Sequence, residues 1–331
     1  MPNPNVCLAR RGLLASALAA WMPVARGQAA AYPSRPILVI VPFAAGGSVD
    51  AAARLLMPRL AERLRQPVVI ENVPGAAGTI GTLRATRSAP DGHVLLFAVA
   101  SPINVAPLVS PSLVKYDALR DLAPVATVGT SPFVLVANPK VAAATTAELI
   151  ELARRQPGRL GYGTDGVGTS MHVTAELIQQ RAGMQLMHVP YRSGPQVLIE
   201  LSGGVLDLAV MPVTLAQPFI KDRKVRALGV TSRQRWPSLP DTPALAETPV
   251  LQGLDVESWY GLFAPARTDA GIVERLAREL AAVAAEPDTA RRLEEYGLKA
   301  ASSGPAAFAA MLARERAALS AVVSAAGIKA E

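Results

Sequence analysis

Glycine-rich turns that follow apolar strand patterns are the parts of this sequence best suited to bind a small ligand. The first lies in ILVIVPFAAGGSVD, residues 37–50, where a helical pattern begins near Ser48 directly after the glycines. Such a turn presents backbone N–H groups beside the positive end of a helix dipole, and together these bind an anion without a charged side chain. The alternative is that the glycines only permit a tight turn and that Asp50 only complements the dipole.

Two further turns have the same character. Residues 75–81 read GAAGTIG, and residues 163–172 read GTDGVGTSMH. In the latter, backbone amides and the hydroxyls of Thr169 and Ser170 lie at a helix start, a combination that distinguishes carboxylate oxygens well. If this helix start faced the first turn, the pair would form a carboxylate clamp. The alternatives are helix–sheet packing for residues 75–81 and an ordinary helix cap, worth about 1 kcal/mol, at Thr169 or Ser170.

The segment HVPYRSGP, residues 188–195, places an aromatic and a cationic side chain in a turn after a strand pattern. Tyr191 could wall a ligand pocket, and Arg192 could pair with a second carboxylate. An arginine on an exposed loop is usually only solvated, so Arg192 by itself does not define a site.

The same residues disfavour other chemistries. No lysine follows the first glycines and they do not form a GxGxxG fingerprint, so nucleotide binding is not expected. The three histidines are far apart in the sequence, which disfavours a metal site. Ser48, Ser101 and Ser170 do not lie in a G-x-S-x-G elbow, so a Ser–His–Asp hydrolase is the weaker alternative. We expect no catalytic residue and no cofactor.

The N-terminal residues have the layout of an export signal. Arg10 and Arg11 precede an apolar run over residues 12–22, and small residues follow over 27–31. The run is about half of the ~20 residues that a membrane-spanning helix needs. We therefore expect a signal peptide over residues 1–29, cleaved after Ala29 or Ala31 and exported by the general secretory or the twin-arginine route. The alternative is an uncleaved anchor or a disordered tail.

The composition agrees with an exported globular protein. The chain has 331 residues and a formal charge of +7; removing residues 1–29 takes away three arginines and no acids, which leaves 302 residues and +4. The remaining basic residues are dispersed among acids, so no nucleic-acid partner is expected. The only cysteine, Cys7, leaves with the signal peptide, so the mature chain has no disulfide and depends on its core. A chain of this length most readily builds that core as two domains.

Strand and helix patterns alternate in two series. The first series predicts strands at 37–42, 67–71 and 94–98 and helices at about 49–65 and 77–88. Pro58 should kink the first helix or shorten it. The strands are continuous apolar runs, which is typical of a sheet covered on both faces. Residues 101–132 are rich in proline and serine and lack a clear period, so we interpret them as a connection between lobes.

The second series contains shorter elements. It predicts strands at 133–137, 160–163, 186–189, 206–210 and 225–231, with helices at 146–155, about 169–182 and 195–202. A proline-rich loop, a strand at 259–263 and three helices near 269–285, 287–295 and 305–326 complete the chain. Two α/β lobes joined by crossing segments describe a hinged clamshell, in which ligands bind at the carboxyl ends of the strands. We expect residues 32–130 plus 232–331 to form lobe 1 and residues 131–231 to form lobe 2, each a mainly parallel sheet flanked by helices.

Taken in order, these motifs resemble the substrate-binding proteins of tripartite tricarboxylate transporters, often called Bug receptors. The resemblance covers nearly the whole mature chain. It is carried by YPSRPILVIVPFAAGGSVDAAAR at 32–54, VVIENVPGAAGTIGT at 68–82, YGTDGVGTSMHVTAEL at 162–177, HVPYRSGP at 188–195, GGVLDLAV at 203–210, RALGVTS at 226–232 and SWYGLFAPA at 258–266. An ordered series of this kind is more specific than any single motif.

The resemblance implies a periplasmic two-lobe Venus-flytrap fold, similar to type II binding proteins, that closes on a small carboxylate. In the family, the first glycine turn and the helix start of the second lobe grip the carboxylate, partly through bridging waters. Carried over to this chain and joined with the second turn, this implies the ligand-binding residues Phe43, Ala44, Ala45, Gly46, Gly47, Ser48, Asp50, Gly75, Ala76, Gly163, Thr164, Gly168, Thr169, Ser170, His172 and Tyr191.

Two departures from the family pattern bear on the ligand. The turn after Tyr191 reads RSGP at 192–195, where the family usually has glycine directly after the basic residue. After Asp207 the chain reads VMPV at 210–213, where the family commonly has a polar or acidic residue. An acid that recognises an amine is therefore expected to be missing. Its absence favours a dicarboxylate, or a carboxylate with an apolar or aromatic body, over an amino acid.

From the resemblance we expect a monomeric periplasmic receptor, not an enzyme, that delivers a small organic carboxylate to the membrane subunits of a tripartite tricarboxylate transporter. A ligand-sensing receptor for a signalling partner is the alternative, and a periplasmic hydrolase is the weaker one. Mutation of Ser170 would separate the last two classes, because an enzyme would lose turnover whereas a receptor would lose only affinity.

Overall fold

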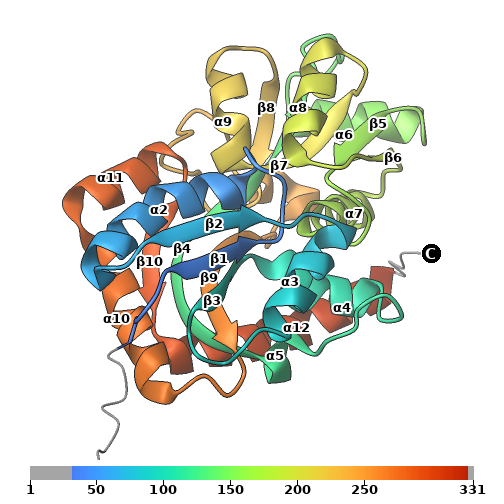
Figure 1. Cartoon of the computed structure of the whole chain (residues 1–331). Coiled ribbons are helices and arrows are strands. Elements are labelled where there is room, and N and C mark those ends of the chain that lie inside the picture. Colours follow the sequence, from blue (N-terminus) through green and yellow to red (C-terminus); the bar gives the residue numbers. More distant parts are fainter. Residues whose placement is uncertain (1–31, 327–331) are drawn as a thin grey trace, which may run out of the picture. The chain divides into compact units, whose positions relative to one another are not determined.

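The computed structural model describes residues 32–326, and the expected export signal over residues 1–29 lies outside them (Figure 1). From Arg35 onward the described chain forms one unit in which strands and helices alternate. The α/β class expected from the sequence is thereby confirmed. Within residues 32–326, no helix is long and apolar enough to cross a membrane.

The first sheet begins with three parallel strands. These are β1 (Ile37–Val41), β2 (Val68–Asn72) and β3 (Val94–Ala98), joined through α2 (Ser48–Leu64), a 3₁₀ turn at Ala76–Gly78 and α3 (Thr79–Thr86). The order is β2-β1-β3, with Ile37 opposite Val68 and Leu38 opposite Val94. Each connecting helix returns the chain to the end of the sheet where the previous strand began. The three strands are therefore parallel, and the turns that follow them lie together at their carboxyl ends.

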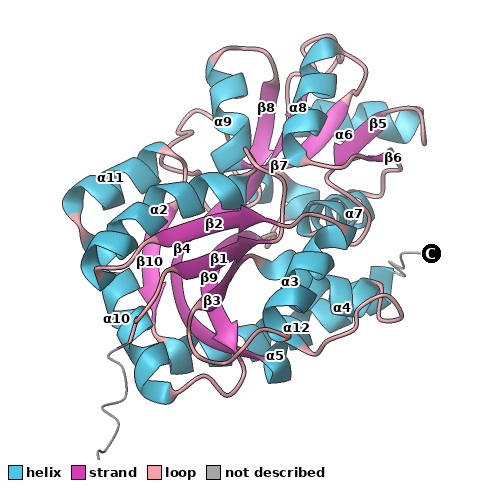
Figure 2. Ribbon diagram, viewed as in Figure 1, coloured by secondary structure: helices cyan, strands magenta, loops and turns pink. Residues whose placement is uncertain are grey.

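Antiparallel strands complete the first sheet. They are β9 (Glu257–Pro265), which pairs with β3, the first part of β4 (Leu122–Ala137), which pairs with β9, and β10 (Lys299–Ser303), which pairs with β4. Helices lie on both sides of this sheet, with α2 packed against α10 (Ala270–Ala285) and α11 (Pro287–Glu295), and with α3 and α12 (Pro305–Ala326) on the other side in this view (Figure 2).

The second sheet contains the rest of β4. It joins β5 (Gly161–Thr164), β6 (Met187–Pro190), β7 (Leu208–Pro212) and β8 (Arg226–Val230). β5 is parallel to β6 and β7, whereas β4 is antiparallel to β7 and β8. The accompanying helices are α6 (Thr146–Arg155), α7 (Ser170–Ala182), α8 (Gly194–Gly203) and α9 (Val213–Lys221).

β4 belongs to both sheets. Its residues up to Pro132 pair with β9, and from Phe133 onward they pair with β7, so the partner changes between Pro132 and Phe133. The buried side chains form separate clusters: Phe133, Tyr162 and their neighbours fill one around the second sheet, and Trp259, Phe263 and their neighbours fill another beside the first. These two clusters belong to sheets that are linked by continuous backbone pairing through β4.

The short elements follow β3 and β8. They are a π turn at Ser101–Val105, α4 (Ala106–Val109), α5 (Ala118–Asp121), and two 3₁₀ turns at Leu245–Glu247 and Pro249–Leu251. These turns carry the chain over the ends of the sheets.

Several sequence expectations need correction. The sheets are mixed and not mainly parallel, because β4, which pairs in both sheets, and β9 run antiparallel to their neighbours. Residues 101–132 are not an irregular connection: the 16-residue β4 begins at Leu122, and Pro124, Gly129 and two register shifts obscure its pattern. α2 continues through Pro58 to Leu64, so the shorter helix does not form. The lobe boundaries at residues 130/131 and 231/232 remain predictions.

Besides the short helices α4 and α5, the elements α9 and β10 were not expected. α9 follows β7 directly and contains Pro218, and this internal proline hides the helical pattern. β10 reads KAASS and is half-exposed, so it has no apolar run to reveal it.

Candidate functional site

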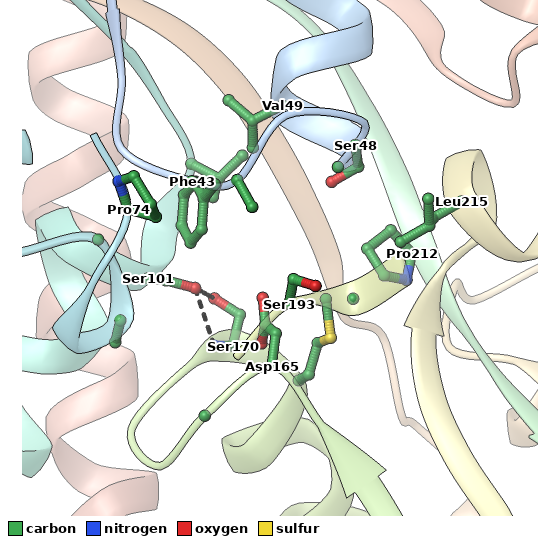
Figure 3. Close-up of a pocket in the computed structure, with 18 of the residues that line it drawn as sticks. Phe43, Ser48, Val49, Pro74, Ser101, Asp165, Ser170, Ser193, Pro212 and Leu215 are labelled. Carbon is green, nitrogen blue, oxygen red and sulfur yellow. Dashed lines mark hydrogen bonds between the residues drawn. The ribbon is translucent and has the colours of Figure 1, made fainter. Parts of the chain in front are cut away.

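A cavity of about 620 Å³ lies where strand-to-helix turns of the two sheets meet (Figure 3). From the first sheet it is lined by the turn into α2, by residues 74–78 and by the end of β3. From the second sheet it is lined by the β5–α7 loop, the β6–α8 turn and the junction of β7 with α9. Phe133 of β4 and Tyr260 of β9 complete the wall.

The turn into α2 presents a helix start to this cavity. Gly46 has a positive φ of 78°, which a residue without a side chain adopts at no steric cost, and Gly47 precedes the helix in an extended conformation. In the described structure no side chain caps α2 at Gly47. Because Gly47, Ser48 and Val49 line the cavity, the amides of the first helical turn are available to an anion there.

Asp50 supports this turn from behind. Its carboxylate accepts hydrogen bonds from the Gly46 amide (2.9 Å), from Arg54 Nε (2.9 Å) and from Asn72 Nδ2 (3.0 Å). Asn72 also donates to the Phe43 carbonyl at 3.1 Å. Burial raises the pKa of Asp50, but these hydrogen bonds outweigh it and hold the pKa below its usual value. Asp50 therefore remains ionised and fixes the shape of the turn.

Tyr260 brings a phenol to the cavity wall near Ser48. Tyr260 lines the cavity, and its hydroxyl is 3.2 Å from the Thr214 hydroxyl. Burial raises the pKa of Tyr260 more than its hydrogen bonds with Ser48 and Thr214 lower it. The phenol thus stays protonated and keeps a proton to donate.

The start of α7 faces the same cavity, but most of its amides already have partners. Thr169 accepts a hydrogen bond from the His172 amide at 3.3 Å, and His172 Nδ1 accepts one from the Gly168 amide at 3.2 Å. The Ser170 amide donates to Ser101 Oγ at 2.9 Å, and the two serine hydroxyls are also 2.9 Å apart (Figure 3). This pair of bonds joins the end of β3 to the start of α7.

A stack of aromatic rings holds the β5–α7 loop from the core side. The ring centroids of His172 and His188 are 4.2 Å apart, and those of His188 and Tyr162 are 4.9 Å apart. His188 Nε2 lies 2.7 Å from the Thr164 hydroxyl. Burial, and then the neighbouring His172, lower the pKa of His188 to about 4, and burial lowers the pKa of His172 despite Glu176. Both rings are neutral at pH 7 and act as rigid supports.

A third helix start reaches the cavity at α8. Ser193, Gly194 and Pro195 line the wall, and within the described chain no side chain caps α8 at Ser193. Pro195 lies in the first turn of this helix, where a missing N–H costs little.

The described lining contains two charged side chains, Arg192 and Asp165. Asp165 Oδ1 is buried and accepts no hydrogen bond from any described residue. Burial raises the pKa of Asp165 to about 6, which hydrogen bonds from Thr169 and its own backbone amide only partly offset.

Of the sixteen residues predicted to bind a ligand, all of which the structure describes, eight line the cavity. They are Phe43, Ala44, Gly47, Ser48, Gly75, Ala76, Ser170 and Tyr191. The other eight lie behind it or beside it: Ala45, Gly46, Asp50, Gly163, Thr164, Gly168, Thr169 and His172. Gly163 is a packing position, because a Cβ there would lie 2.5 Å from Leu206 Cδ1. Direct contact of these residues with a ligand stays a prediction.

Much of the cavity wall could not be recognised from the sequence. Phe133, Ser258 and Tyr260 come from strands and not from glycine-rich turns, and only the sheet topology brings them to the cavity. Asp165 was visible inside the third turn, where a charged residue among glycines was a usable signal. Residues 192–195 also line the cavity, whereas only the preceding Tyr191 was predicted to bind the ligand.

The arrangement suits binding more than bond breaking. Among the described residues, no hydrogen bond joins Ser170 to His172, because the serine pairs with Ser101 and the histidine with Gly168. No group of three His, Cys, Asp or Glu residues in the range 32–326 is placed to hold a metal ion. The cavity therefore offers uncapped helix starts, hydroxyl groups, one cationic side chain and one anionic side chain.

Comparison with known proteins agrees with this geometry. A protein-family profile described as "Tripartite tricarboxylate transporter family receptor" matches residues 52–328. The "UPF0065 protein in tcbD-tcbE intergenic region" of Pseudomonas sp. strain P51 is 38% identical over 311 residues, which cover 92% of this chain and 91% of that protein.

Solved structures with bound carboxylates have a similar fold. R. palustris Rpa4515 with adipate has a TM-score of 0.87 at 29% identity, covering 90% of this chain and 99% of that one. MatC (Rpa3494) from Rhodopseudomonas palustris with bound malate has a TM-score of 0.83 at 28% identity, covering 88% of this chain and 100% of that one.

Proposed function

Because this chain belongs to the tripartite tricarboxylate transporter receptor family, we propose that it is a periplasmic receptor that closes on a small organic carboxylate. It is a solute-binding protein and not an enzyme. The observation that carries the proposal is the uncapped start of α2, whose first-turn residues Ser48 and Val49 line the cavity. Buried amides at a helix N-terminus bind a carboxylate strongly, since each charge-assisted hydrogen bond contributes about 1.5–3 kcal/mol.

The rest of the wall favours a particular kind of ligand body. Phe43, Val49, Pro74 and Leu215 give the cavity apolar walls, which an aliphatic or aromatic body would cover. Arg192 adds a cation that could pair with a second carboxylate. We therefore infer that the ligand is a dicarboxylate or a carboxylate with an apolar body, as the adipate and malate bound by two structural relatives also suggest.

The family also suggests the destination of the ligand. Receptors of this family serve tripartite transporters, so we propose that the closed form docks, as a monomer, on the membrane subunits of such a transporter. The periplasmic location is supported by the residue pattern of the N-terminal export signal and by the periplasmic relatives.

Calorimetric titration of the mature protein with mono-, di- and tricarboxylates, aromatic acids and acidic amino acids tests the proposal. A ligand at 100 times its Kd should also stabilise the protein by about 2.7 kcal/mol. If none of these acids bound, the proposal would fail.

A matched pair of variants tests the role of α2. Ser48→Pro removes one amide donor at the first helical position, where proline is tolerated and where the extended Gly47 suits a following proline. Ser48→Ala keeps the amide and removes only the hydroxyl. We expect the proline variant to bind the carboxylate at least tenfold more weakly than the alanine variant. Equal affinities would show that the carboxylate does not lie at the start of α2.

A further inference from the structure

Asp165 is an anionic side chain inside a cavity that we propose to bind anions. It follows β5 directly, in the loop that leads to α7, and it lines the cavity. Figure 3 shows its carboxyl group projecting into the cavity from this loop, on the side opposite Ser48 and Phe43, with Ser170 and Ser193 drawn to either side of it. An acid at this position would repel a simple carboxylate, so its presence calls for a physical reason.

The carboxylate is only half satisfied by the protein. Oδ1 is buried and receives no hydrogen bond from the described residues, and only the nearby Thr169 side chain and its own backbone amide lower the pKa that burial raises. Buried polar atoms without a partner are rare because each costs about 1–3 kcal/mol. Native structures keep such atoms mostly where a ligand, an ion or a water completes them.

No cationic side chain of residues 32–326 neutralises this group. The interactions that shift the pKa of Asp165 include none from a cationic side chain of the described chain. Its pKa of about 6, raised by burial, still leaves the carboxyl largely ionised at pH 7. An ionised oxygen accepts hydrogen bonds and donates none, so the group that completes it must bring a proton of its own.

We propose that Asp165 is a specificity-determining residue that selects carboxylates bearing a hydrogen-bond donor, either a hydroxyl or an ammonium group, on the carbon body. This inference rests on the proposed function and narrows its ligand class. The ligand carboxylate binds at the start of α2, and the donor of the same ligand binds the carboxylate of Asp165 across the cavity. A body without a donor leaves Oδ1 unpaired in a cavity that the ligand has emptied of water.

Asp165 also changes an expectation from the sequence. The apolar residues at 210–213 suggested that an acid able to recognise an amine was missing, because none follows Asp207 at the end of β7. The cavity nevertheless contains a carboxylate, supplied by the loop after β5 in place of β7. Pro212 lines the cavity and leaves that side apolar. A donor-bearing ligand is therefore compatible with the apolar end of β7.

Matched ligand series test the proposal on the wild-type protein by calorimetric titration. Each series changes one substituent from hydrogen to hydroxyl to ammonium. The α-substituted series are succinate, malate and aspartate, and 3-phenylpropanoate, 3-phenyllactate and phenylalanine. A series with the donor at the far end is pentanoate, 5-hydroxypentanoate and 5-aminopentanoate. In at least one series the donor-bearing members should bind about 10- to 100-fold more tightly than the parent acid.

The Asp165→Asn variant identifies the responsible group, because it keeps the size of the side chain and removes its charge. Its preference for the ammonium member should fall at least tenfold, while the parent acid should bind as well as before or better. Asp241→Asn, which changes an exposed acid, serves as the control and should leave every affinity unchanged. If the Asn variant is poorly folded, Asp165→Ser serves in its place.

The outcomes separate the two proposals. If no acid of any series binds, the proposed function fails, and the role of Asp165 fails with it. If parent acids bind as tightly as their hydroxyl and ammonium analogues in every series, the receptor stands and the role of Asp165 is refuted. A preference for the ammonium member that survives undiminished in the Asn variant also refutes it. Preference for hydroxyl over ammonium, or the reverse, identifies which donor the site accepts.

Discussion

Replacing Asp50 with asparagine isolates the electrostatic support of the binding turn, because the two side chains have the same shape. All three partners of Asp50 are donors: the Gly46 amide and Arg54 Nε bond one oxygen, and Asn72 Nδ2 bonds the other. Asparagine offers only one acceptor oxygen, so its NH₂ group must face a donor on one side. The Asp50 side chain is 3% exposed, and water cannot replace the lost bond.

The expected loss follows from these contacts. A buried donor left without a partner costs about 1–3 kcal/mol, and a negative charge in the first turn of a helix contributes about 0.3–1 kcal/mol. The ion pair with Arg54 adds little, because the arginine side chain is 56% exposed. We therefore expect Asp50→Asn to lower the free energy of unfolding by about 2 kcal/mol, and Arg54→Ala to lower it by about 0.5 kcal/mol.

Urea denaturation at pH 7 measures both variants against the wild type. The advantage of the wild type should be present above pH 3.8 and disappear as the pH falls through the lowered pKa of folded Asp50, since protonation removes the acceptor. A loss below about 0.5 kcal/mol for Asp50→Asn, or an equal loss for Arg54→Ala, would refute the argument that buried hydrogen bonds hold this turn.

Two further predictions concern the β5–α7 region. Gly163→Ala should lower the free energy of unfolding by about 1–3 kcal/mol in urea denaturation, because the new Cβ would lie 2.5 Å from Leu206 Cδ1; an unchanged midpoint would mean that this contact relaxes freely. The pKa of His188 is about 4 when folded and near 6.5 when unfolded, so the unfolded chain binds the proton first and stability should fall as the pH drops from about 6.5 to 4. His188→Gln should flatten that part of the curve of urea midpoint against pH, and an unaltered slope would assign it to other groups.

The sequence predicted the regular part of the fold well. β1, β3 and α6 were identified to within a residue, because apolar runs and helical periods there are uninterrupted. The elements it missed lack such periods, as α9 contains a proline and β10 contains few apolar residues. The antiparallel insertion of β4 and β9 was also not predictable, since local pattern does not report strand direction.

The site was predictable only where it is built from residues that are consecutive in the sequence. The turn before α2 is recognisable in the sequence by its glycines, and Phe43, Ala44, Gly47 and Ser48 line the cavity. Thr169 and His172 were expected at the ligand from the family resemblance, yet the His172 amide donates to the Thr169 hydroxyl. Whether the amides at a helix start are free or already bonded depends on residues elsewhere in the chain. Ser101, which accepts a hydrogen bond from the Ser170 amide, lies 69 positions before Ser170.

The change of partner along β4 has a mechanical consequence. Pro132, the last residue paired with β9, and Pro212, which lies opposite Phe133, have no amide hydrogen to give to the ladder. The ladder therefore lacks two amide donors at this point, although Phe133 still donates to the Thr231 hydroxyl and accepts from the Thr231 amide, both at 2.9 Å. Phe133 lies at this point and also lines the cavity. A small rotation of the backbone between Pro132 and Phe133 would produce a larger displacement of the loops that form the cavity walls.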